Sequence, residues 1–547
     1  MTKTKSLPRP TVSRATVVEY VKRIWAQHAF IVILSSVFLI VATILILTLF
    51  SHQLNPDATS YFTIAQKYAH GDIKHAINGY WGPLFSWLLV PAVWLNMSLT
   101  VAGKLLTAVV AVLLLCTVYA FFRSRSVKPV VSAFVLIAMA TLLMEWTVVE
   151  AISPDLLIAF LTVLFATKLS NFIARPARNQ GILLGLIGAA LYFTKGFGFF
   201  LFLGVVGLVA LWQWQKQDGR NLRKVWQRYA PMLLTFFTVA LPFIAVISIK
   251  YHAPTINNAG AYNQHVTGPL NKSVQPIEYM GPLPLPNSSA ISAWEDPTIF
   301  VDLVPGWNPL SSRTNLGFFI NNIFYYNFNQ IIHYMYGLGP LVCAGLVALL
   351  VGMFQKKNRQ RDFVIFGLVV STMLLAYAIV FVVSRYLWAA GLLGIMALGL
   401  WLDYVVDRKA LDIRQVAIGG LLVCGVMMLS IGQYIGDSKN PDIEWYKSAI
   451  SLKKVIPQGS KIMSDNFNHS YHACYYLKLK CYNVVAPPPA GKQQAYYQSL
   501  KDMGVAYYVD YHTRDTDEAL DAFVSTYFVK VDSRVTERVP VTTYKIK

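Results

Sequence analysis

The stretch AFIVILSSVFLIVATILILTLF, residues 29–50, is followed at once by SHQLNPDATSYF, residues 51–62. The first stretch is long and predominantly apolar, and about 20 such residues in a helix span a hydrocarbon core of ~30 Å. Lipid offers no hydrogen-bond partner to the backbone, so the run should be helical. It is too long for a signal-peptide core, and no small-residue cleavage site follows it. The sequence therefore predicts an uncleaved membrane helix, joined to a polar segment that carries an aspartate.

The rest of the chain repeats this pattern. Of its 547 residues 55% are hydrophobic and 14% charged, which is far from the composition of a soluble globular enzyme. Together with the first run, the further apolar runs predict an α-helical polytopic membrane protein with about eleven transmembrane helices. These further runs lie near residues 100–122, 130–149, 155–174, 180–194, 197–214, 230–250, 331–354, 363–383, 386–403 and 415–436.

Basic residues occupy every second connection between these runs. Membrane proteins keep lysine and arginine in cytoplasmic loops, so these connections should be cytoplasmic, together with the N-terminal segment 1–28. We therefore expect a multi-pass protein of the plasma (inner) membrane with an extracytoplasmic C-terminus. The basic connections are 123–128, 175–178, 216–228, 356–361 and 408–414, and the sparsely basic ones are 51–99, 150–154, 195–196, 251–330 and 384–385.

The net charge of +20 arises largely from these loops. Such a distribution favours contact with anionic lipid head groups. A nucleic-acid interface would instead show a basic stripe interleaved with aromatic residues in a soluble segment, and none is present. We expect membrane lipid and no nucleic acid as partners.

The composition divides the chain into domains. Residues 29–436 form the membrane domain, with a first external loop at 51–99 and a large external loop at 251–330. Residues 440–547 have the composition of a soluble α/β domain, which we expect to be extracytoplasmic. In it Cys474 and Cys481 are candidates for a disulfide bond. Its expected strands are 461–464, 482–485, 505–510 and 528–531, and its expected helices are 444–454, 468–477 and 492–503.

Asp57 lies in the first turn of a predicted helix, after the N-cap candidate Asn55 and after Pro56. Apolar residues at helical spacing follow, Tyr61 among them, and predict an amphipathic helix on the outer membrane surface. From the local pattern alone, a carboxylate that only stabilises the helix dipole is the favoured explanation of Asp57.

Asp155 repeats this arrangement after Ser153 and Pro154, with Glu150 just before it. Here too a helix start with interface anchoring is the plain explanation. The pair is more informative than either acid, because Asp57 and Asp155 are both expected at one membrane face. There an acceptor hydroxyl and a phosphate leaving group could meet.

Four motifs in this order carry a resemblance to a known family. The chain resembles the GT-C class of multispanning glycosyltransferases, especially the branch of protein O-mannosyltransferases and the lipid A aminoarabinose transferase. The segments that carry the resemblance are residues 57–62, Asp155 with Glu150 as competing candidate, residues 185–196 ending in Lys195-Gly196, and residues 384–387, which include Arg385 and Tyr386.

The resemblance implies a GT-C-like fold and an inverting transfer of a sugar from a polyprenyl-phosphate donor. The acceptor would be a protein, a lipid or a cell-envelope glycan. Asp57 would act as the base or position the acceptor, with Asp155 as the second acid. Lys195, Arg385 and Tyr386 would bind the donor phosphate and stabilise the departing anion.

One departure concerns the first external loop, where the family often has a cation before a proline turn. Residues 79–84 carry none, so one phosphate contact is either missing or supplied by His70, Lys74 or His75. The external histidines match no metal-site spacing. We expect no certain cofactor, although a divalent metal held by carboxylates stays an alternative.

Two other functions remain open at this point. A transporter or flippase would share the membrane layout, but it usually shows internal repeats or charges at the bilayer midplane. No repeat is evident in this sequence. An oligosaccharide ligase or polymerase differs from the first hypothesis only in its acceptor.

Overall fold

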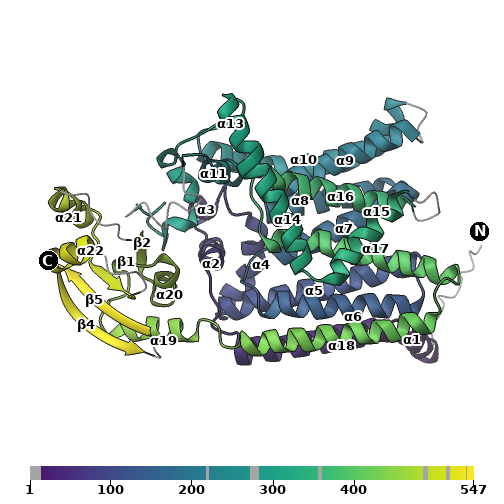
Figure 1. Cartoon of the computed structure of the whole chain (residues 1–547), viewed down its shortest axis with the longest axis horizontal. Coiled ribbons are helices and arrows are strands. Elements are labelled where there is room, and N and C mark those ends of the chain that lie inside the picture. The colour runs from purple at the N-terminus through teal and green to yellow at the C-terminus, as the bar shows by residue number, and fades with distance from the viewer. Residues whose placement is uncertain are drawn as a thin grey trace, which may run out of the picture.

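The computed structural model describes residues 14–216, 221–270, 283–354, 360–484, 491–512, 518–536 and 539–547. Figure 1 shows two parts: a bundle of long helices, and a small domain with a sheet that contains the C-terminus. Some predicted features lie outside the described residues. These are the first residues of the N-terminal segment 1–28, part of the large external loop 251–330, and parts of the basic loops 216–228 and 356–361.

Nine helices of the described chain are long and apolar enough to cross a membrane. Each follows an apolar run, because a helix satisfies all its backbone hydrogen bonds within the segment. The protein is therefore a multi-span membrane protein. The nine are α1 (Arg14–Leu49), α5 (Leu99–Ser124), α6 (Pro129–Val148), α7 (Asp155–Ala174), α9 (Phe197–Lys216), α10 (Leu222–Lys250), α16 (Gln360–Ala378), α17 (Trp388–Asp407) and α18 (Ile413–Asp437).

Two of the eleven expected spans depart from this pattern. The expected span 180–194 is α8 (Arg178–Thr194), a helix of 17 residues that packs between α7 and α10. The expected continuous span 331–354 is broken: the helical stretch Arg313–Gly337 and α15 (Pro340–Phe354) meet at an angle of 116°. Gly339 allows this bend with a φ of +105°, and Pro340 starts the next helix. The stretch before the bend consists of α13 (Arg313–Phe318), η3 (Phe319–Tyr325) and α14 (Tyr326–Gly337).

Short helices cover the end of the bundle that faces the C-terminal domain. Among them α2 differs from the expected surface helix, because its polar side is buried as well as its apolar side. The reason is that the segment around Trp294 lies over that polar side: the Ser60 hydroxyl donates to the Trp294 carbonyl at 3.2 Å. These short elements are α2 (Pro56–Ala69), α3 (Ile73–Ala76), α4 (Pro83–Trp94), α11 (Ala259–Val266), η1 (Ala293–Glu295), η2 (Pro297–Leu303) and η4 (Ser384–Leu387).

The C-terminal domain contains a five-stranded sheet in the order β2-β1-β3-β5-β4. β1 pairs in parallel with β2 and β3, whereas β5 is antiparallel to both β3 and β4. The strand β5 and the helix α22 were not expected from the sequence. The elements are α19 (Ile443–Ser451), η5 (Leu452–Lys454), β1 (Lys461–Ser464), α20 (Phe467–Leu477), β2 (Lys480–Val484), α21 (Gln493–Asp502), β3 (Tyr507–Asp510), α22 (Glu518–Tyr527), β4 (Phe528–Thr536) and β5 (Val539–Ile546).

Helix α20 joins the two parts of the molecule. Phe467 and Tyr471 of this helix belong to the same hydrophobic core as the membrane helices. The ring of Tyr475 lies 5.7 Å from that of Phe62 on α2, centroid to centroid. The C-terminal domain is therefore packed directly on the helix that begins beside Asp57.

Candidate active site

Four elements meet where the bundle faces the C-terminal domain. Asp57 stands at the start of α2, Asp155 at the start of α7, Lys195 at the turn between α8 and α9, and Arg385 in η4. Asn55, expected to cap α2 with its side chain, makes no such hydrogen bond, and its buried Oδ1 has no partner among the described residues. The structure thus gathers four charged side chains that lie far apart in the sequence.

Arg385 connects the two aspartates. Its Nη2 donates a hydrogen bond to Asp57 Oδ2 at 2.9 Å. Its Nε lies 2.9 Å from Asp155 Oδ2, close enough for an ion pair. Within the described chain Nε has no hydrogen-bond partner, so the guanidinium keeps unused donors.

Asp155 is held more tightly than Asp57. It is 1% exposed, and the Ser153 hydroxyl donates to its Oδ2 at 2.7 Å. Lys195 Nζ donates to the other oxygen, Oδ1. A buried carboxylate is tolerated only when charges and donors compensate it, and here two cations and a hydroxyl do so.

Aromatic rings line up beside this cluster. Lys195 Nζ lies 4.1 Å from the centre of the Tyr386 ring. The Tyr386 ring stacks on Tyr377, and Tyr377 stacks on Phe197, with centroid distances of 5.0 and 4.5 Å. Tyr386 thus contacts both a cation and a stack of aromatic rings.

These residues line a cavity of about 600 Å³. Its wall has a charged part and an apolar part, which suits an amphiphilic ligand with an anionic group. Among the described residues that line it, the cations are Lys195 and Arg385. The charged part comprises Asp57, Asp155, Lys195 and Arg385, and the apolar part includes Phe197, Phe200, Ala376, Ile379, Val380 and Phe381.

Tyr61 and Trp294 complete the surroundings of Asp57. The Trp294 indole donates to Asp57 Oδ1 at 3.1 Å. Tyr61 also lines the cavity, and burial raises its pKa well above the usual value, so the phenol stays neutral. Trp294 was not among the residues expected from the sequence, because this contact joins α2 to η1, 237 positions later.

Glu150 is not among the residues that line the cavity. It lines a small separate pocket with Lys104. Lys104 is buried and donates to the carbonyls of Val148 and Glu150, at 2.6 and 3.0 Å. These contacts hold the loop that leads to Asp155. No sequence pattern indicates this role, because the partners of Lys104 are main-chain atoms.

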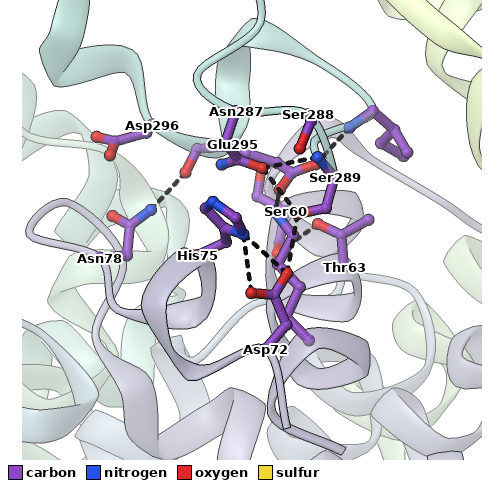
Figure 2. A network of polar contacts seen from close by, with 12 residues as sticks. Ser60, Thr63, Asp72, His75, Asn78, Asn287, Ser288, Ser289, Glu295 and Asp296 are labelled. Atoms are coloured by element: carbon purple, nitrogen blue, oxygen red, sulfur yellow. Dashed lines mark hydrogen bonds and ion pairs between the residues drawn. The ribbon is translucent and has the colours of Figure 1, made fainter. Parts of the chain in front are cut away.

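His75 lies outside the residues that line the cavity. Figure 2 shows it beside Asp72, with its Nδ1 2.8 Å from Asp72 Oδ1. His70 and Lys74, the other two candidates for the missing cation, are also outside the lining. The glycine in residues 79–84 has a packing reason. A Cβ at Gly82 would lie 2.3 Å from the Thr194 carbonyl oxygen, so no larger residue fits there.

The described residues contain no group of three or more His, Cys, Asp or Glu side chains placed to hold a metal ion. A divalent ion at the cavity would have Asp57 and Asp155 as ligands, and both are already paired with cations. In the C-terminal domain a disulfide links Cys474 of α20 to Cys481 of β2, with 6.0 Å between their Cα atoms.

The fold is shared with solved structures of low sequence similarity. No protein-family model and no curated sequence matches the chain. ArnT from Cupriavidus metallidurans, solved in the apo state and bound to undecaprenyl phosphate, superposes with a TM-score of 0.56 at 14% identity. The match covers 95% of this chain and 98% of that chain. The Archaeoglobus fulgidus oligosaccharyltransferase gives a TM-score of 0.51 at 10% identity, over 87% of this chain and 69% of that chain. The protein has the GT-C fold, as the resemblance in its sequence predicted.

Proposed function

We propose that the protein is a glycosyltransferase that moves a sugar from a polyprenyl-phosphate donor to an acceptor nucleophile. The observation that carries the proposal is the bridge from Arg385 to Asp57 and Asp155 at the wall of an amphiphilic cavity. An arginine with unused donors suits a phosphate group. The apolar part of the wall suits the first units of a polyprenyl chain.

The donor phosphate would lie between Lys195 and Arg385. Both cations already face carboxylates, so an arriving phosphate competes for them and does not meet bare positive charge. As the bond between the sugar and the phosphate breaks, negative charge grows on the leaving oxygen. The two cations stabilise this charge without moving far.

Asp57 would accept the proton of the nucleophile. The acceptor oxygen attacks the anomeric carbon from the face opposite the phosphate, and the bond to the phosphate breaks with its electron pair. The acceptor proton goes to the Asp57 carboxylate, and the configuration at the anomeric carbon is inverted. Trp294 and Arg385 each bind one oxygen of this carboxylate, which fixes its orientation.

We place this reaction at the extracytoplasmic face of the plasma membrane. The support is the charge pattern: the loops near the cavity are poor in lysine and arginine, and the loops at the other end are rich in them. On this basis the C-terminal domain is extracytoplasmic too. The acceptor would be a protein, a lipid or a cell-envelope glycan that reaches this face.

The substitution Asp57→Asn tests the proposal. It keeps the shape of the side chain and removes the base, so turnover should fall on the order of 10³-fold. Binding of undecaprenyl phosphate, used as a probe, should change by no more than a few fold. Turnover is measured with the polyprenyl-linked sugars that mass spectrometry identifies in lipid co-purified with the protein.

Asp72→Asn is the matched control, because Asp72 is a carboxylate of the adjacent α2–α3 turn that lies outside the cavity lining. This variant should transfer sugar at the wild-type rate. Unimpaired turnover of Asp57→Asn would exclude Asp57 as the base.

A further inference from the structure

Asp57 is held by two segments that both touch the C-terminal domain. One is the chain just before it, around Leu54, and the other is the loop that carries Trp294. The two segments come from distant parts of the sequence. Both contact the same helix–strand unit of the C-terminal domain, which consists of α20 followed by β2.

The first segment is fixed through the main chain of Leu54, three residues before Asp57. The Leu54 N–H donates to Asp442 Oδ2 at 3.0 Å. The Leu54 carbonyl accepts a hydrogen bond from the Tyr471 hydroxyl at 2.8 Å. Leu54 and Tyr471 are both buried. Both polar groups of one peptide residue are therefore fixed by side chains from outside the membrane domain, and water has little access to replace them.

Neighbouring contacts extend this attachment. The N–H of Asn440 donates to the Leu49 carbonyl at 2.8 Å. The ring of His52 stacks on Tyr446 at a centroid distance of 4.0 Å. The chain between α1 and α2 is thus held along its length by the start of the C-terminal region.

The second segment is fixed to β2. The Cys481 N–H donates to the Ile291 carbonyl at 2.7 Å, and the Ile291 N–H donates to Glu295 Oε1 at 2.6 Å. Glu295 also forms a buried ion pair with Lys67 of α2. Figure 2 shows Glu295 between Ser60 and Asn78, and the Asn78 side chain donates to the Glu295 carbonyl. These contacts set the position of the neighbouring Trp294, whose indole binds Asp57.

A disulfide bond links α20 to β2, the two elements of the C-terminal domain that contact these segments. Cys474 lies one turn after Tyr471 on α20, and its disulfide partner Cys481 is the residue that binds Ile291. A movement of α20 relative to β2 would therefore act on both sides of Asp57 at once. The disulfide opposes such a movement.

We infer that the C-terminal domain positions the Asp57 carboxylate for proton transfer, with Tyr471 and Trp294 as the positioning residues. The inference rests on the proposed function, because it gives Asp57 a catalytic role. The physical reason is the narrow tolerance of such reactions: displacing a reacting group by about 1 Å can cost on the order of 100-fold in rate. Tyr471 sets where the main chain begins α2, and Trp294 sets how the carboxylate is turned.

The substitution Tyr471→Phe tests the inference, because it removes one hydroxyl and keeps the ring in the core. We expect kcat to fall on the order of 10-fold, while the KM for the donor stays within about twofold. Hydrogen–deuterium exchange of a peptide spanning residues 50–60 should become faster. Trp294→Phe should give the same kinetic pattern, with faster exchange limited to the start of α2.

Tyr511→Phe is the control. Tyr511 is buried in the same domain, and its hydroxyl has no hydrogen-bond partner among the described residues. This variant should match the wild type in kcat and in exchange. It tests whether removing a buried tyrosine hydroxyl that makes no hydrogen bond within the described chain lowers kcat or speeds exchange by itself.

The outcomes separate the two proposals. An inactive Asp57→Asn with a fully active Tyr471→Phe would overturn the positioning role and leave the proposed function intact. Normal turnover of Asp57→Asn would exclude Asp57 as the base and would overturn the inference that the Leu54 attachment positions a catalytic group, while sugar transfer itself would stand. A fall in kcat for Tyr471→Phe, with unchanged KM and faster exchange at residues 50–60, would support the inference.

Discussion

Two ends of the same helix, α7, each border a cluster of arginine and aspartate, but the clusters are built differently. At the start of α7, Arg385 makes one hydrogen bond within the described chain and borders a cavity. Near its end, Arg125 donates twice to Asp362, at 2.7 and 2.9 Å, and also to Ser170 and Asn171. The first cluster has unused donors, whereas the donors of the second are engaged.

This contrast distinguishes a cluster that borders a cavity and could take a ligand from one whose donors only join helices. Both contain a buried aspartate, and Asp155 and Asp362 are each 1% exposed. Burial of charge therefore does not separate them. What separates them is that Arg385 makes one hydrogen bond within the described chain and borders a cavity, whereas the donors of Arg125 are engaged by Asp362, Ser170 and Asn171.

Among the predicted changes in activity, loss of Arg385 from the cluster that borders the cavity should have the strongest effect. Arg385→Ala should lower kcat/KM for the donor by about 100-fold or more, because the phosphate loses its main donor. The apparent affinity for undecaprenyl phosphate should fall as well. The loss of stability should be smaller than for removal of Arg125, since Asp155 keeps Lys195 and Ser153 as partners. Arg385→Lys keeps the charge but cannot bridge both aspartates, so it should recover only part of the rate. If Arg385→Ala bound the donor as tightly as the wild type, the Arg385 cluster would not be a donor-binding site. The two clusters would then not differ in function.

The cluster of Arg125 and Asp362 should respond in the opposite way, with a loss of stability and an unchanged transfer rate. Arg125→Ala leaves Asp362 buried without its main partner, which should cost about 3–5 kcal/mol of folding free energy. Transfer per folded molecule should stay at the wild-type level. Unfolding by SDS in mixed micelles measures the stability, and the assay of donor turnover measures the rate.

A double variant sharpens this prediction. Arg125→Met with Asp362→Leu removes both charges, and well-packed apolar residues can replace a buried pair at little cost. We expect it to regain more than half of the lost stability. A double variant as unstable as Arg125→Ala would show that the other contacts of the cluster dominate.

The fold was largely predictable because lipid leaves the chain few choices. Apolar length and the alternation of basic loops gave the membrane helices, and both signals are local in sequence. The break at Gly339 escaped this reasoning, because the apolar run continues across it. The strand β5 escaped because Pro540 lies near its start, where proline is tolerated although it usually argues against a strand.

The candidate site was predictable only in part. Sidedness placed Asp57, Asp155 and Arg385 at one end of the bundle, which is a coarse statement about position. The contacts that orient Asp57 come from Trp294 and, through Leu54, from Tyr471, and neither belongs to a repeated pattern. Such contacts depend on how loops fold over the bundle, which no local spacing reveals.

The smallest expected effect concerns metal ions. Each oxygen of Asp155 faces a cation, Lys195 or Arg385, and Arg385 also binds Asp57. A divalent ion between the carboxylates would be repelled by these cations, by about 4 kcal/mol for each pair of unit charges at 4 Å near a protein surface. Under the proposed function, Arg385 and Lys195 would supply the positive charge that a metal ion would otherwise bring to the donor phosphate. The transfer rate should therefore differ by less than about twofold between two assays, one with free EDTA and one with EDTA that has been saturated with Mg²⁺. Activity that is lost in EDTA and restored by Mg²⁺ or Mn²⁺ would mean that the ion displaces Arg385 from at least one aspartate. The cluster would then bind a metal ion when the donor is present, and Arg385 would pair with both aspartates only while the donor is absent.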